Sequence, residues 1–99
     1  MTITTAEKQL ESPEVLSWLT VKFADWLEVP AKELDPKQPI ASYGLDSISA
    51  VTLSVQLEDE LCVELDTAVL WDRPTLESLA EHLAEKLNDA GSTRLPELR

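Results

Sequence analysis

The chain has 99 residues, of which 43% are hydrophobic, so it is long enough for one domain with a buried core. Its formal net charge of -11 argues against binding to nucleic acid or to anionic membranes, because like charges repel. A single cysteine, Cys62, excludes an internal disulfide and a cysteine metal cluster, and it is expected to be a small buried residue.

The two ends of the chain are predicted to lie outside the folded domain. Residues 1–11 are polar and are expected to form a flexible leader, 12–89 the folded domain, and 90–99 a C-terminal tail. No basic region precedes an apolar run, and no apolar run is long enough for a bilayer. A cytoplasmic location is therefore expected, and the charge favours a monomer.

The first predicted helix begins at Ser12-Pro13-Glu14, which reads as N-cap, first helical residue and first-turn acid. Pro30 should end it near Val29, because proline disfavours helical backbone in the residue before it. Its apolar residues recur at helical spacing: Leu16, Leu19, Phe23, Trp26 and Leu27.

A long connection with three prolines follows, from Pro30 to Asp46. Connections of this length in a small domain are usually functional or packed by their own side chains. Leu34, Ile40 and Leu45 are spaced to attach it to the core.

The second helix is predicted to run from Ser47 to Leu61 and to carry two apolar stripes. The first stripe is Ala50, Leu53, Leu57 and Leu61, and the second is Ile48, Val51 and Val55. Ser54 and Glu58 are expected to separate the stripes on one side. Either both stripes are buried, or one faces the core and the other a partner protein.

Two further helical segments complete the chain. Thr67 to Trp71 is expected to form one short turn, and Thr75 to cap a last helix that stops at Asn88-Asp89-Ala90-Gly91. The core positions of the last helix are Leu76, Leu79, Ala80, Leu83, Ala84 and Leu87. No segment alternates as a strand would, so the prediction is an all-α fold with three main helices and one short helix.

Ser47 stands at the N-terminus of the second helix, where free backbone N–H groups and the helix dipole favour a phosphate. Its surroundings resemble the phosphopantetheine attachment region of acyl carrier proteins, most of all those of polyketide synthases. The matching residues run from Pro39 to Leu53 and include Gly44-Leu45-Asp46-Ser47. Leu70-Trp71-Asp72-Arg73-Pro74-Thr75 resembles a helix junction of the same family.

The resemblance implies a four-helix bundle in which Ser47 bears a 4′-phosphopantetheine arm taken from coenzyme A. It further implies that Asp46 contributes to contacts with the phosphopantetheinyl transferase and Mg²⁺. The chain would then be a covalent shuttle for acyl or polyketide thioesters and not an enzyme. By position, the resemblance assigns partner binding to Ile48, Val51, Val55, Glu58 and Asp59, and the acyl pocket to Leu53, Leu57 and Leu61.

The partners implied are the transferase, an acyl-loading enzyme (an acyltransferase or an acyl-activating ligase), a ketosynthase and tailoring enzymes. A fatty-acid carrier and a peptidyl or aminoacyl carrier are the alternatives within the family. Few acids in the first half of the second helix disfavour the former, and Leu45-Asp46-Ser47 disfavours the latter.

Two alternatives come from other classes. One is an acidic helical adaptor without a prosthetic group, for which Ser47 would be only part of a helix cap. The other is a phosphorelay bundle that uses His82, the one histidine, which is expected to be a solvated surface residue. A single histidine on the last helix also leaves no set of side chains for nucleophilic catalysis.

Overall fold

The computed structural model describes residues 10–91 and 95, and within them the chain forms a bundle of four helices. The elements are α1 (Ser12–Leu27), the 3-10 turns η2 (Ala31–Glu33) and η3 (Ile40–Tyr43), α2 (Ser47–Leu61), α3 (Val69–Asp72) and α4 (Leu76–Asp89). The all-α prediction is confirmed, since no strand occurs among the described residues. None of the described helices is both long and apolar enough to cross a membrane.

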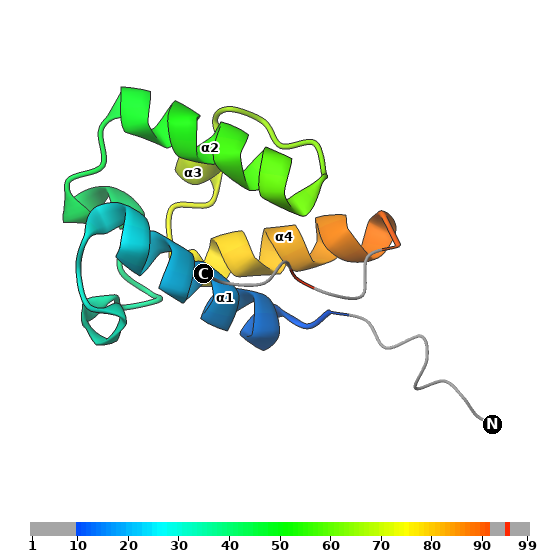
Figure 1. Cartoon of the computed structure of the whole chain (residues 1–99), viewed down its shortest axis with the longest axis horizontal. Coiled ribbons are helices and arrows are strands. Elements are labelled where there is room, and N and C mark those ends of the chain that lie inside the picture. The colour runs from blue at the N-terminus through cyan, green and yellow to red at the C-terminus, as the bar shows by residue number, and fades with distance from the viewer. Residues whose placement is uncertain (1–9, 92–94, 96–99) are drawn as a thin grey trace.

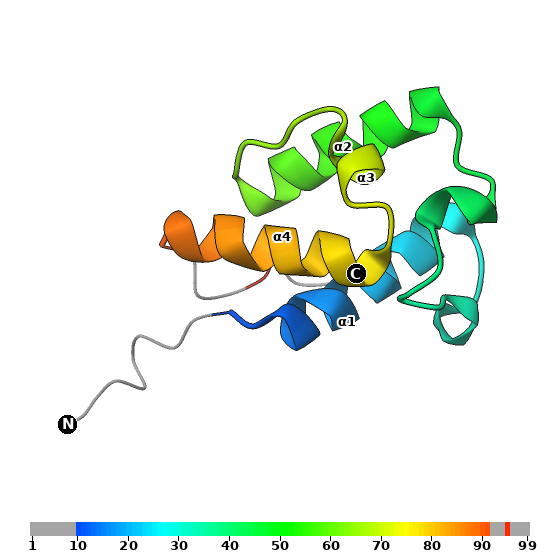
Figure 2. The ribbon, with the colours of Figure 1, turned by 180° about the vertical axis from the view of Figure 1, so that it is seen from behind.

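Helix α1 packs against α4, α3 packs against α2, and α2 runs beside the α1–α4 pair (Figures 1 and 2). Helices α2 and α4 run in the same direction and α1 runs against them, so the end of α1 and the start of α2 share one end of the bundle (Figure 1). The start of α1 and the end of α4 share the other end.

The core draws on every helix and on the long connection. Phe23 is fully buried, and its ring meets that of Trp26 edge to face at 5.2 Å between centroids. From the connection, the predicted anchors Leu34, Ile40 and Leu45 are all buried. Helix α2 contributes Ala50, Leu53, Leu57 and Leu61, as its first stripe predicts.

Most predicted helix bounds hold to within two residues. Helix α2 matches its prediction at both ends, and Thr75 caps α4 by accepting a hydrogen bond from the Ser78 N–H at 3.1 Å. Helix α1 starts one residue early, because Glu11 and not Ser12 takes the extended N-cap conformation. It ends at Leu27, where Glu28 turns the backbone into the left-handed region at a φ of 59°.

One side chain of α2 and the residue that follows the helix are placed differently from their predictions. Ser54 is buried, since it follows Ala50 by four residues and precedes Leu57 by three, which puts it on the core face. Its hydroxyl donates to the Ala50 carbonyl at 2.9 Å. Cys62 is exposed and not buried, because it ends the helix in the left-handed conformation.

The long connection is tied to the start of α4. The Ile40 N–H donates to the Pro74 carbonyl at 2.7 Å, and the Glu77 N–H donates to the Pro36 carbonyl at 3.0 Å. The second bond satisfies one of the N–H groups that a helix start leaves without an intrahelical partner. The junction between α3 and α4 therefore holds the segment that leads into α2.

The described part of the chain begins packed and not free. Leu10, within the predicted leader, is buried, and its N–H donates to Asn88 Oδ1 at 2.9 Å. The Asn88 Nδ2 donates in turn to the Leu10 carbonyl at 2.9 Å. Glu11, also in the predicted leader, caps α1. Residues 1–9 of the predicted leader, and residues 92–94 and 96–99 of the predicted tail, lie outside the described residues.

Replacing Asn88 with alanine should therefore loosen the start of the chain. Both hydrogen bonds to Leu10 are lost, which at about 0.5–1.5 kcal/mol each should lower the free energy of unfolding by about 1–3 kcal/mol. Amide hydrogen exchange should show faster exchange at Leu10, and urea unfolding gives the free energy. Asp89→Ala, at the exposed neighbouring residue, is the control, and equal effects of the two changes would contradict the prediction.

Candidate functional site

Ser47 is the first residue of α2, and its side chain is exposed. The chain reaches it through Gly44, whose φ of 94° lies in the left-handed region that favours glycine. The Gly44 N–H closes η3 by donating to the Ala41 carbonyl at 3.1 Å. Buried Leu45 before Ser47 and buried Ala50 after it fix the backbone on both sides. The hydroxyl thus lies open to solvent at the start of α2, between residues that are anchored in the core.

Asp46 caps the helix on which Ser47 stands. Its Oδ1 accepts a hydrogen bond from the Ser49 N–H at 2.8 Å. This bond, and a second from the Ser49 hydroxyl, lower the pKa of the Asp46 carboxyl, because both favour the ionised form. The carboxylate is therefore ionised at neutral pH, on the residue that directly precedes Ser47.

The cap gives a pH dependence that can be tested with Asp46→Asn. Because the folded-state pKa of Asp46 is below its ordinary value of 3.8, its stabilising contribution is present above that value and is lost as the pH falls through the lowered pKa. Asparagine caps as well but does not titrate. Melting temperatures between neutral pH and about pH 3 should therefore fall more steeply for the parent than for the variant. Parallel curves would contradict the assignment.

A phosphate on Ser47 would meet favourable groups. The first N–H groups of an α-helix have no intrahelical partner, and the positive end of the helix dipole lies there. The Asp46 carboxylate occupies the Ser49 N–H, which leaves the N–H groups ahead of it in the first turn for an anion. The residues present thus fit a phosphodiester at Ser47.

The second stripe of α2 is exposed. We call Ile48, Val51 and Val55 the apolar face; their side chains are 79%, 43% and 44% exposed. Trp71 on α3 is also 44% exposed and was not among the predicted partner residues. A helix of four residues turns Val69 and Leu70 inward and leaves Trp71 outside. Of the two alternatives for α2, the structure supports one stripe in the core and one facing outward.

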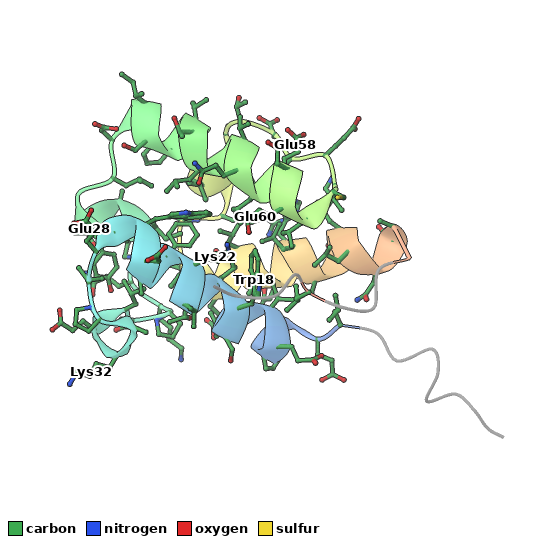
Figure 3. All side chains as sticks on the ribbon, in the orientation of Figure 1. Trp18, Lys22, Glu28, Lys32, Glu58 and Glu60 are labelled. Atoms are coloured by element: carbon green, nitrogen blue, oxygen red, sulfur yellow. The ribbon has the colours of Figure 1, made fainter. Side chains whose placement is uncertain are left out.

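The two predicted docking acids differ in their surroundings. Asp59 is exposed, whereas Glu58 is half-buried and its Oε2 accepts a hydrogen bond from the Leu65 N–H at 3.1 Å. Glu58 thereby holds the segment between α2 and α3. The neighbouring Glu60 pairs with Lys22 of α1 at 2.6 Å, and the Lys22 ammonium lies 5.4 Å from the Trp18 ring centroid (Figure 3).

The predicted acyl-pocket residues are not equivalent either. Leu57 and Leu61 lie in the core, whereas Leu53 reaches the wall of a cavity of about 220 Å³ between α1 and α2. We call this cavity the α1–α2 groove. Its lining residues are Trp26, Leu27, Gly44, Leu45, Ile48, Ser49, Thr52 and Leu53.

A larger cavity of about 440 Å³ lies against α3 and α4 and includes His82. His82 is half-buried and not fully solvated as expected, and Arg73 and Lys86 line the same cavity. Burial, and then the charges of Arg73 and Lys86, lower the pKa of His82. Within residues 10–91 and 95, no group of three or more His, Cys, Asp or Glu side chains could hold a metal ion.

Residues 17–83 of the chain match the family model described as phosphopantetheine attachment site. Polyketide synthase PksL of Bacillus subtilis is 35% identical over 74 residues, which is 75% of this chain and 2% of that synthase. The chain thus spans a very small part of this relative.

Solved structures of carrier proteins share the fold. A free-standing peptidyl carrier protein from Acinetobacter baumannii aligns with a TM-score of 0.71 and 38% identity, covering 78% of this chain and 96% of that one. The HMG-ACPI domain of the CurA module from Lyngbya majuscula aligns with a TM-score of 0.78 and 26% identity, covering 93% of each.

Proposed function

Because the chain belongs to the phosphopantetheine-attachment family of carrier proteins, we propose that Ser47 is the residue that bears its 4′-phosphopantetheine arm. A member of this family is a shuttle and not a catalyst, and the arm supplies the thiol on which acyl groups travel. The observation that carries the assignment is the exposed hydroxyl at the first residue of α2, held between buried Leu45 and Ala50. The ionised Asp46 beside it would contribute to Mg²⁺ and transferase contacts.

The experiment is loading by a promiscuous phosphopantetheinyl transferase with coenzyme A and Mg²⁺, followed by intact and fragment mass spectrometry. One phosphopantetheine per chain is expected, localised to Ser47. The protein contains other exposed serines, such as Ser42 and Ser49, so the fragment spectra decide between residues. A folded chain that gains no mass would overturn the proposal and favour the acidic adaptor.

The cargo that we propose is a polyketide-type acyl group. The similarity to polyketide synthase PksL supports it. The 38% identity to a free-standing peptidyl carrier protein supports an aminoacyl cargo as the second candidate. Offering the loaded protein to an acyltransferase with malonyl-CoA, and separately to an adenylating enzyme with an amino acid and ATP, distinguishes them by the thioester mass that accumulates.

The proposed partners are the transferase, an acyl-loading enzyme, a ketosynthase and tailoring enzymes. The apolar face, with exposed Asp59, would receive them, because it lies on the helix that Ser47 begins. Glu58 would contribute less, since its carboxylate already bonds the Leu65 N–H. We also propose a cytoplasmic location, with which the exposed free thiol of Cys62 is consistent. The net charge of -11 supports a monomer, because like-charged copies repel one another.

A further inference from the structure

The α1–α2 groove opens beside the start of α2, where Ser47 stands. Four of its lining residues, Ile48, Ser49, Thr52 and Leu53, belong to the first two turns of α2. Gly44 and Leu45 come from the turn that presents Ser47, and Trp26 and Leu27 from the end of α1. Ile48 therefore stands at its rim, next to Ser47 in the chain.

The chemistry of the groove is mixed. Leu45 and Leu53 are buried and Trp26 is half-buried, so one part is apolar. Ser49 and Thr52 add hydroxyl oxygens, and the Thr52 hydroxyl already donates to the Ile48 carbonyl at 3.0 Å. Its oxygen remains able to accept a hydrogen bond. A suitable occupant carries apolar methyl groups and amide N–H donors along one chain.

The pantetheine portion of an arm on Ser47 has this chemistry, with two amides and a geminal dimethyl group. We propose that this segment docks in the α1–α2 groove against Trp26, on the α1 side of α2. The inference rests on the proposed function, because it requires the arm to begin at Ser47. It places the arm outside the core, whereas Leu57 and Leu61 remain packed inside it.

The size of the groove favours a tethered occupant over a free one. At about 220 Å³ it is smaller than the roughly 300–1,000 Å³ of typical small-molecule sites. A free ligand would gain too little contact there to offset its lost translational freedom. An arm attached one residue from the rim is present at an effective concentration of about millimolar or more, so weak contacts suffice.

The test compares the unloaded and loaded protein by nuclear magnetic resonance. The arm is unlabelled and the protein is labelled with ¹³C and ¹⁵N. We expect filtered nuclear Overhauser contacts between the arm methyl groups and the Trp26 ring, with a shift of the Trp26 indole N–H signal. The indole signals are assigned by Trp26→Phe. Contacts with Val51 and Val55 of the apolar face but not with Trp26, or no contacts at all, would overturn the docking.

A matched pair of variants makes the test sharper. Thr52→Leu fills the groove from an exposed position of α2, and the contacts to Trp26 should be lost while loading at Ser47 is retained. Gln56→Leu makes the same kind of change one turn further along, at an exposed residue outside the groove, and should leave the contacts intact. Loss in both variants, or in neither, contradicts the docking. Failure to load the parent chain would instead contradict the proposed function, so the two failures are distinguishable.

Discussion

Replacing Ser47 with alanine is expected to abolish phosphopantetheine loading completely. Alanine has no oxygen with which to form the phosphodiester, so no other property of the site can compensate. The fold should be retained, because the Ser47 side chain is exposed and alanine is a good helix former. Intact mass after incubation with transferase, Mg²⁺ and coenzyme A should show a gain in the parent and none in the variant.

Ser49→Ala is the matched control for this experiment. Ser49 lies two residues further along the same helix and is exposed like Ser47. Its hydroxyl contributes to the lowered pKa of Asp46, but its backbone N–H, which alanine keeps, makes the capping bond. Loading of the Ser49→Ala variant should therefore persist. Retained loading in Ser47→Ala would refute the assignment and move the attachment to another hydroxyl.

Replacing Phe23 with alanine is expected to be the most destabilising single change considered for this chain. The side chain is 0% exposed, and its ring meets that of Trp26 at 5.2 Å and 70°. Truncating a buried phenylalanine costs about 3–5 kcal/mol, through lost burial and the cavity that remains. Domains of this size have a total stability of about 5–15 kcal/mol, so a large part of it would be lost.

Urea unfolding followed by circular dichroism measures this effect. Val21→Ala serves as the control, since Val21 lies on the same helix and is 42% exposed. A surface substitution of this kind should change the free energy of unfolding by within about 0.5 kcal/mol. Similar midpoints for the two variants would show that α1 does not bury Phe23 in solution.

Trp26 connects the α1–α2 groove with the buried Phe23. Trp26 lines the α1–α2 groove and is held by its edge-to-face contact with Phe23. Because Trp26 is already held in place, its side chain loses little conformational entropy when the arm docks, so weak contacts are enough for binding. Phe23 thus supports the groove indirectly, by holding Trp26 in place, and does not itself line the groove.

Local patterns in the chain were enough to predict the helices, and the Gly44-Leu45-Asp46-Ser47 motif was enough to single out Ser47 as the proposed attachment residue. Gly44 and Asp46 act through their own backbone and through Ser49, so the start of α2 could be predicted to the residue. The helical spacing of the apolar residues likewise predicted that Ala50, Leu53 and Leu57 face inward. These signals work within one or two turns of chain, where φ, capping and side-chain period suffice.

The partners of individual side chains could be known only from the packed bundle, because they come from distant parts of the chain. The carboxylate of Glu58 is used by Leu65, seven residues away, and Asn88 holds Leu10 from 78 residues away. The α1–α2 groove exists because the end of α1 and the start of α2 meet at one end of the bundle. The sequence of neither helix predicts where the other one packs, because contacts between helices depend on segments that are distant in the chain.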